Sequence, residues 1–182
     1  MTLQSSPEAT CQVCERPFMR ANTMQTACSV RCAIKVPVLK RKAERADTKA
    51  RKEAVKTRRQ WLDEAQTAVN RYVRLRDAAL GCVSCDRPPS WGGQWHASHF
   101  RSVGAASAVR FNLWNIHKAC SICNNWKSGN LSEYEPRLRA RIGDDRVEWL
   151  RSQNQLAAYP VEYLKRLKGV FNKKAKRQEA RR

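Results

Sequence analysis

Acidic residues, histidines and long apolar runs are all scarce in this sequence of 182 residues. No apolar stretch approaches the ~18 residues that a membrane-spanning helix needs, and the opening segment MTLQSSPEAT lacks the apolar run of a secretory signal. The mean hydropathy of −0.70 is that of a water-soluble chain. These absences argue against membrane residence and secretion, so we expect a cytoplasmic protein.

The shortage of acidic residues leaves a large positive charge. Sixteen Asp and Glu oppose 36 Lys and Arg, which gives a formal net charge of +20 and an isoelectric point near 10.3. Such a balance predicts a polyanionic partner before it predicts a fold. Because so much of the chain consists of charged runs, we do not expect one large hydrophobic core.

The eight cysteines fall into two groups of four, each built from two close pairs. Two thiolates with two residues between them can reach one metal ion at about 2.3 Å, and two such pairs complete a tetrahedron. Structural zinc is therefore expected at each group, with disulfides or free thiols as the alternative. A four-thiolate zinc has no open coordination position, so it stabilises the fold without doing chemistry. The two quartets are Cys11, Cys14, Cys28 and Cys32, then Cys82, Cys85, Cys120 and Cys123.

The cysteines divide the chain into segments. Between the quartets the chain runs from Ala33 to Ala79 without a glycine, which predicts one long helix or two in line. The expected segments are a disordered N-terminus at 1–10, a zinc module at 11–32, a long basic helix at 33–80, a zinc-stapled centre at 81–130, helices at 131–164 and a basic tail at 165–182.

The first half of the long helix is strongly basic. Between Lys35 and Arg59, eleven cations face three acidic residues. On a solvated helix these cations would repel one another, so we favour the interpretation that they contact DNA phosphates. The tail at 165–182, with nine basic residues and one acidic, is expected to be disordered when free and to bind DNA as well. The expected DNA contacts on the helix are Lys40, Arg41, Lys42, Arg45, Lys49, Arg51, Lys52, Lys56, Arg58 and Arg59.

The second half of that helix has an apolar face. From Trp61 to Ala79, apolar residues recur at steps of four and three, the spacing of a helix that buries one side. This face can pack within its own domain, which we favour, or on a second copy of the chain. It is the sequence's only indication of a homodimer contact, at 61–79.

Residues 91–130 hold all three histidines and four of the six tryptophans. We expect an extended piece at 94–100, a small-residue loop, a second extended piece at 110–116, and a helix beginning at Asn124 after the last cysteine pair. In a regular strand His96 and His99 lie on opposite faces, and a bulge or the strand end could bring both to one site. The tryptophans can stack on DNA bases or form a core, and the core is the favoured reading.

The order of residues here resembles a known nuclease motif. His99 resembles the first half of an HNH endonuclease motif, and Asn115 with Cys120-x2-Cys123, Asn124 and Lys127 resembles the second half. Those enzymes have a ββα-metal fold. Over residues 11–150 the chain also resembles the NinG (Rap) family, recombination endonucleases of lambda-type phages that act on branched DNA. Further residues that carry this resemblance are Trp95, Arg110-Phe111-Asn112, Ile116-His117-Lys118 and Ser128-Gly129-Asn130.

The resemblance implies roles for individual residues. His99 would be the general base that activates water, Asn115 would orient His99 through a hydrogen bond, and Asn124 would be a ligand of one catalytic Mg²⁺ or Mn²⁺. Position 98, where HNH sites usually carry a carboxylate, is Ser98, and His96 stands where the NinG-like pattern has an acid. A His96–Asn124 ligand pair would be a softer site that also tolerates Ni²⁺ or Zn²⁺.

The remaining polar residues of this segment have several readings. Arg101, Lys118 and Lys127 are expected to contact phosphate, although a solvated loop position is equally open for Arg101. His117 can be a metal ligand, a phosphate contact or a strand residue that faces the zinc knuckle.

Together these features predict a mainly helical α+β protein with two structural zincs, a long basic helix and a small HNH-like centre. The expected function is that of a structure-specific DNA endonuclease that hydrolyses Holliday junctions or D-loops in phage recombination, in the host cytoplasm. Two alternatives stay open: a zinc-finger DNA-binding or architectural protein without catalysis, and an HNH nicking or homing nuclease that acts on linear DNA.

Overall fold

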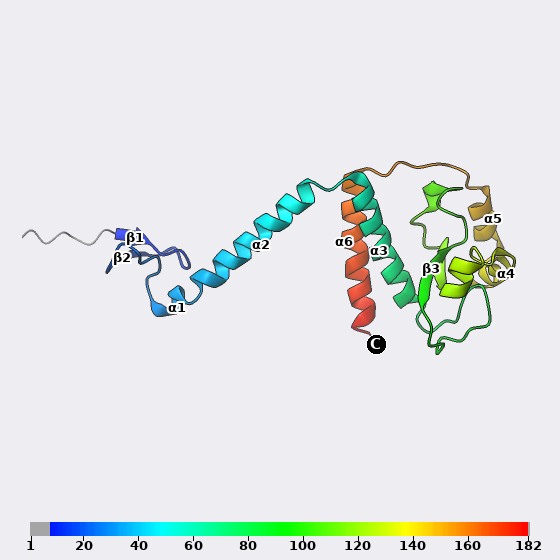
Figure 1. Ribbon diagram of the computed structural model, residues 1–182, viewed down its shortest axis with the longest axis horizontal. Helices are drawn as coiled ribbons and strands as arrows, with labels where there is room; N and C mark the ends of the chain where they lie inside the picture. Colours follow the sequence, from blue (N-terminus) through cyan, green and yellow to red (C-terminus); the bar gives the residue numbers. More distant parts are fainter. Residues whose placement is uncertain (1–7, 182) are drawn as a thin grey trace, which may run out of the picture. The chain divides into compact units, whose positions relative to one another are not determined.

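The computed structural model describes residues 8–181 and confirms the α+β class, with about half of the chain in helices (Figure 1). The chain divides into two compact units, residues 1–56 and 57–182. The disorder expected for 1–10 falls mostly on residues outside the described range, and Glu8–Thr10 form a strand. No helix in the described part of the chain is long and apolar enough to cross a membrane.

The first unit has almost no core. Strand β1 (Glu8–Thr10) pairs antiparallel with β2 (Pro17–Met19), and the short helix α1 (Val30–Ala33) is capped by its preceding serine. Helix α2 (Val36–Ala54) has no buried residue. Cys11 and Ala27 are the buried hydrophobic residues among the described residues of this unit. Such a small core favours a fold that depends on a bound metal.

The segment expected to form one long helix or two in line forms two separate helices. Helix α2 ends at Ala54, and α3 (Arg58–Arg76) begins with a capping box. The side chain of Thr57 accepts a hydrogen bond from the backbone N–H of Gln60 at 3.3 Å, and the Gln60 side chain accepts from the Thr57 N–H at 2.8 Å. This reciprocal pair satisfies the first amide groups of α3 and separates it from α2.

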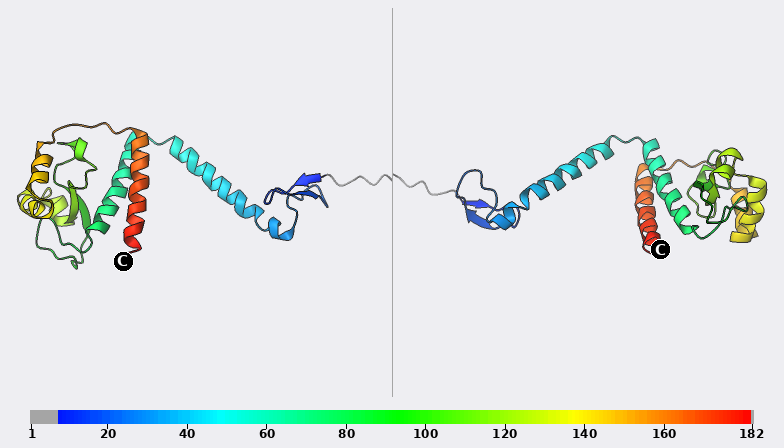
Figure 2. Two further views of the ribbon diagram at one scale, coloured as in Figure 1. Left: turned by 180° about the vertical axis from the view of Figure 1, so that it is seen from behind. Right: turned by 60° about the horizontal axis from the view of Figure 1, so that its bottom comes forward.

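In the second unit, α3 lies alongside α6 (Val161–Glu179), and both views of Figure 2 show the same pairing. The two helices run parallel, since Glu64 pairs with Lys168 and Arg71 pairs with Glu179. The apolar face of α3 is buried in this contact, as we expected for a face that packs within its own domain. The face proposed for a dimer contact at 61–79 is therefore covered largely by α6 of the same chain. The buried residues of α3 are Trp61, Ala65, Ala68, Val69 and Val73.

The expectation of a disordered tail at 165–182 is wrong for its described residues. Helix α6 continues to Glu179, and Leu164, Phe171 and Ala175 are buried. Their spacing of seven and four residues places them on one helix face, which packs against α3. Because lysines and arginines fill many positions between these three residues, the apolar face of α6 is hard to recognise in the sequence.

The hairpin of residues 95–120 differs from expectation in its second half. Strand β3 (Trp95–His99) pairs antiparallel with β4 (Ile116–Cys120), in a register that joins His99 to Ile116. The strand expected at 110–116 begins only at Ile116, because residues 110–115 form a turn after the short 3-10 helix η1 (Ser107–Val109). Asn112 supports the turn by accepting a hydrogen bond from the Trp114 N–H at 2.8 Å.

The helix expected to begin at Asn124 is a single π-helical turn, η2 (Ile122–Trp126). Two longer helices follow, α4 (Leu131–Ile142) and α5 (Asp144–Ser152). They form a second core with the knuckle at Cys82–Val83 and the inner face of the hairpin, built around Phe100, Tyr134 and Leu138. The hairpin thus lies between α3 on one side and α4 with α5 on the other (Figure 1).

Candidate functional site

Both cysteine quartets have the geometry of a metal site. In each, the four Sγ atoms lie within 4.8 Å of one another. The Sγ atoms of Cys14 and Cys28 are 3.5 Å apart, and those of Cys85 and Cys120 are 3.8 Å apart. Thiolates at 2.3 Å from one tetrahedral ion would be separated by about 3.8 Å. Both quartets could therefore hold zinc, and the second joins the knuckle after α3 to the end of β4.

Donors around the second quartet suit a thiolate. The guanidinium of Arg87 donates to Cys85 Sγ at 3.3 Å and to Cys120 Sγ at 3.7 Å, and the Cys120 N–H donates to Cys82 Sγ at 3.2 Å. Burial opposes ionisation of Cys85, but the hydrogen bonds from Arg87 lower its pKa to about 7. Such outer contacts orient metal ligands and favour their charged form. Arg87 was not recognised from the sequence, where it is one cation among 36.

His99 is held in one tautomer. Its Nε2 lies 3.0 Å from the backbone carbonyl oxygen of Arg110. A carbonyl only accepts, so Nε2 carries the proton and Nδ1 keeps its lone pair. Burial, and beyond it the charge of Arg110, lower the pKa of His99 below its ordinary value. The imidazole is therefore neutral at pH 7, with Nδ1 as its basic atom.

Asn115 is fully buried, and its amide is bonded to the loop between the strands. Its Oδ1 accepts from the Arg101 N–H at 2.7 Å, and its Nδ2 donates to the carbonyls of Arg101 and Val109, both at 3.1 Å. The expected hydrogen bond to His99 is therefore replaced by an indirect link. Asn115 fixes both ends of the loop, and the residue after Val109 supplies the carbonyl that holds His99.

His96 and Asn124 meet on the other face of β3. Asn124 Nδ2 is 3.2 Å from His96 Nδ1, and both side chains are partly exposed. Rotating the amide by half a turn would place its oxygen beside the imidazole nitrogen, which makes one nitrogen and one oxygen ligand. Within residues 8–181, the groups of three or more His, Cys, Asp or Glu that could hold a metal are the two cysteine quartets, and His96 belongs to neither. The pair fits a divalent ion of borderline softness that takes its other ligands from water and substrate.

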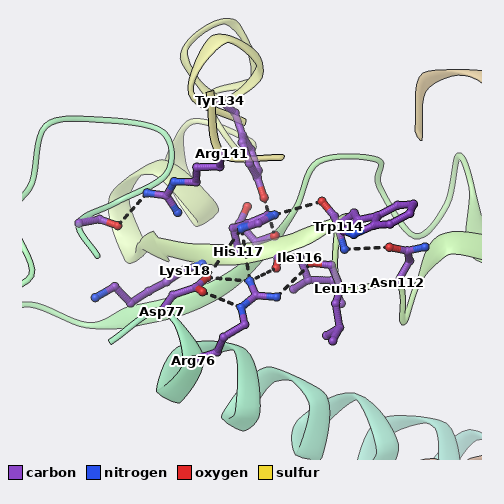
Figure 3. Close-up of polar contacts among 12 residues, drawn as sticks. Arg76, Asp77, Asn112, Leu113, Trp114, Ile116, His117, Lys118, Tyr134 and Arg141 are labelled. Carbon is purple, nitrogen blue, oxygen red and sulfur yellow. Dashed lines mark hydrogen bonds and ion pairs between the residues drawn. The ribbon is translucent and has the colours of Figure 1, made fainter. Parts of the chain in front are cut away.

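His117 belongs to a buried polar network that joins the end of α3 to β4 (Figure 3). Its Nε2 donates to the Trp114 carbonyl at 3.1 Å, and burial with the nearby Arg76 charge lowers its pKa to about 4. Arg76 binds both carboxylate oxygens of Asp77 at 2.6 and 2.8 Å, and Asp77 accepts the Lys118 N–H at 3.0 Å. Among the three roles open to His117 (metal ligand, phosphate contact or strand residue), these buried contacts favour that of a strand residue that faces inward.

The three cations expected at the site have different surroundings. Lys118 is only 3% exposed, and its Nζ donates to the Ala78 carbonyl at 2.9 Å, so its prediction as an open phosphate contact is corrected to a contact that holds α3 to β4. Arg101 donates to Gln153 O at 3.1 Å and to Asn154 Oδ1 at 2.6 Å. Lys127 is exposed, three residues after Asn124.

The basic residues of α2 lie on an exposed helix. Every described cation from Lys40 to Lys52 is exposed, and Arg51 pairs with Asp47 at 3.0 Å. Arg58 and Arg59, expected on the same helix, belong to the first turn of α3 in the other unit.

Exposure separates the four tryptophans of this segment. The rings of Trp91 and Trp95 are partly buried and pack edge to face at 5.2 Å, as the core reading requires. Trp126, on the turn that carries Asn124, is 83% exposed, so it is not a core residue. Trp114 is 39% exposed and packs against Trp149.

Comparison with known proteins gives one consistent result. Residues 4–181 match the family described as Bacteriophage Lambda NinG protein. The protein named ninG of Escherichia phage lambda is 37% identical over 182 residues, which cover 90% of this chain and 88% of that protein. Protein ninG of Salmonella phage P22 is 36% identical over 90% of this chain and 89% of its own length. No solved structure matches the chain.

Proposed function

The chain belongs to the NinG family of bacteriophage proteins, and we propose that it is a metal-dependent endonuclease that hydrolyses phosphodiester bonds in branched DNA such as Holliday junctions and D-loops. One observation carries the proposal. One five-residue strand carries both His99, a neutral histidine with a fixed tautomer, and His96, which contacts Asn124 of η2, beside a quartet that could hold zinc.

His99 is the general base in this proposal. Its Nδ1 accepts a proton from the water that attacks phosphorus, while the Arg110 carbonyl holds the ring through Nε2–H. Because the pKa of His99 is lowered, its ring is unprotonated at neutral pH and does not have to lose a proton before it acts as the base.

His96 and Asn124 would hold the divalent cation, which supplies charge stabilisation to the phosphorane and to the leaving 3′ oxygen when bound. These residues lie on the opposite face of β3 from His99. A phosphate that is close to both His99 and the cation must therefore lie across the unpaired edge of β3, where the two faces meet.

Preference for branched DNA rests on the family resemblance and on the exposed cations of α2. These side chains suit phosphate contact, and nothing on α2 resembles a motif that reads base edges. Binding that depends on backbone position and shape is the kind that distinguishes a junction from a duplex.

The test compares a labelled four-way junction with a linear duplex of the same sequence, in Mg²⁺, Mn²⁺ and Ni²⁺. His99→Ala is expected to lower the cleavage rate by about 10²–10⁴-fold, because it removes the general base, while zinc content and junction binding stay unchanged. No cutting by the wild-type protein in any ion would identify a DNA-binding protein without catalysis. Equal cutting of both substrates would remove the branch preference.

A second variant tests the ligand assignment. His96→Asp restores a hard, charged ligand, so Mg²⁺-supported cleavage is expected to be preserved or raised relative to Mn²⁺-supported cleavage. The ratio of the two rates is the measurement. Loss of cleavage in both ions by a folded, zinc-loaded variant would exclude His96 as a ligand.

A further inference from the structure

A second polar site lies on the face of the hairpin that packs against α3. It is a depression of about 400 Å³ whose charged lining is Arg71 and Arg74 of α3, Lys118 of β4 and Glu179 of α6. Its apolar wall includes the Trp95 ring. The volume falls in the range of small-molecule sites, about 300–1,000 Å³.

The charges of this depression are unbalanced. Arg71 donates to both carboxylate oxygens of Glu179, at 2.6 and 2.8 Å. Arg74, one helical turn away, has no hydrogen-bond or ion-pair partner among residues 8–181 although it is partly buried. Burial and the charge of Arg71 lower the pKa of Arg74. Because Lys118 is buried and donates to the Ala78 carbonyl, and Arg71 is paired with Glu179, Arg74 is the cation of this depression that is placed to bind an added anion.

The position of the depression connects it to the proposed catalytic strand. Trp95 and His99 point to the same face of β3, because residues four apart in a strand share a face. Four residues of strand span about 13 Å, which is about four base steps of B-DNA at 3.4 Å each. A DNA strand that passes His99 along β3 could therefore reach the depression.

We propose that this depression is a nucleotide subsite that binds one backbone phosphate of the DNA strand, away from the bond that is cut. The proposal rests on the proposed function for its substrate. Arg74 contacts the phosphate, Arg71 joins it when Glu179 is displaced, and the wall at Trp95 packs against the sugar and base. Glu179 acts as a competing anion that DNA must replace.

The first test measures junction binding by fluorescence anisotropy without added catalytic metal, using Arg74→Gln and the matched variant Arg166→Gln. Arg166 is an exposed cation of α6 outside the depression, so both variants remove one positive charge. Arg74→Gln is expected to weaken binding about tenfold, the effect of a lost charge-assisted hydrogen bond, and to reduce the salt slope by about one. Equal, small effects of both variants would overturn the subsite.

A second pair of variants keeps the test valid should Arg74→Gln fail to fold, which zinc content and thermal unfolding will show. Glu179→Gln frees Arg71 and is expected to strengthen junction binding several-fold. Glu162→Gln removes the same charge from another α6 ion pair, Glu162–Lys165, and is expected to change binding less than twofold. Equal effects of the two variants would contradict the role of Glu179.

Two competitors identify the occupant. Polyglutamate, at matched ionic strength, is expected to bind without dependence on Arg74, because it offers no phosphate. Inorganic phosphate is expected to compete with the junction in the wild-type protein more than in Arg74→Gln, because it contacts the same guanidinium. An Arg74 effect on polyglutamate equal to that on the junction, or no difference between the two proteins in competition by phosphate, would overturn the nucleotide assignment. These assays need no cleavage, so an Arg74-dependent junction affinity in a protein that cuts nothing would support the subsite and reject the nuclease.

Discussion

The buried amide of Asn115 acts on His99 only through the backbone. Asn115→Ala removes the side-chain partner of the Arg101 N–H and of the Arg101 carbonyl, while the Val109 carbonyl keeps its bond from the Asn112 N–H; this is expected to cost about 2–3 kcal/mol of unfolding free energy. Because the loop then no longer fixes the Arg110 carbonyl, we also expect the cleavage rate to fall by more than junction affinity. Denaturant unfolding and single-turnover cleavage measure the two effects.

Asn112→Ala is the control for this change. Its side chain accepts one hydrogen bond in the same turn and is partly exposed, so we expect a loss of about 1 kcal/mol or less and nearly normal cleavage. If the two variants lower stability and cleavage equally, Asn115 has no special connection to His99.

Residue types at the site could be predicted from the sequence, but their partners could not. The resemblance that rests on His99, Asn115 and Asn124 predicts a candidate functional centre. The atoms that hold His99 and Asn115 are backbone carbonyls and an N–H of loop residues, and every residue of the chain except proline carries such groups. The buried Arg76–Asp77–His117 network was missed for a related reason: His117 is 41 residues from Arg76, and the three residues match no motif.

At the scale of elements, the break between α2 and α3 depends on one capping box. Thr57→Ala removes the hydroxyl that accepts the Gln60 N–H, and we expect it to cost about 1 kcal/mol, the usual effect of a lost N-cap. Thr67→Ala, inside α3, removes a hydroxyl that only donates to the Asp63 carbonyl, so it is expected to be neutral or slightly stabilising. Thermal unfolding followed by circular dichroism distinguishes the two, and equal melting temperatures would show that the cap is unimportant.

Elements with a continuous pattern were predictable, and elements whose pattern was masked were not. The steps of four and three from Trp61 onward correctly indicated a buried helix face. Phe111 and Leu113 alternate with polar residues as in a strand, yet both lie in a turn where Asn112 and Asn115 bond to the backbone. In α6 the apolar residues Val161, Leu164, Leu167, Phe171 and Ala175 recur at steps of three and four, but lysines and arginines fill many of the positions between them.

At the scale of the whole molecule, the two units have unequal cores. The first unit has Cys11 and Ala27 as its buried hydrophobic residues, again within residues 8–181, whereas the second has two hydrophobic clusters. Loss of a bound metal should therefore affect them differently, because a unit without a core has nothing else to oppose the entropy of its chain.

This inequality predicts separate consequences for one cysteine of each quartet. Cys28→Ser is expected to unfold residues 8–35 and to release one zinc, while the melting of the second unit and cleavage at His99 stay unchanged. Cys123→Ser removes a fully buried ligand beside η2. We expect it to release the other zinc and abolish cleavage by displacing Asn124, with the α3–α6 pair still helical. Zinc content, circular dichroism and cleavage measured on both variants test this division. If Cys28→Ser abolished cleavage of a bound junction, the first quartet would be part of the catalytic fold. DNA binding by α2 would then not be independent of the cleavage chemistry.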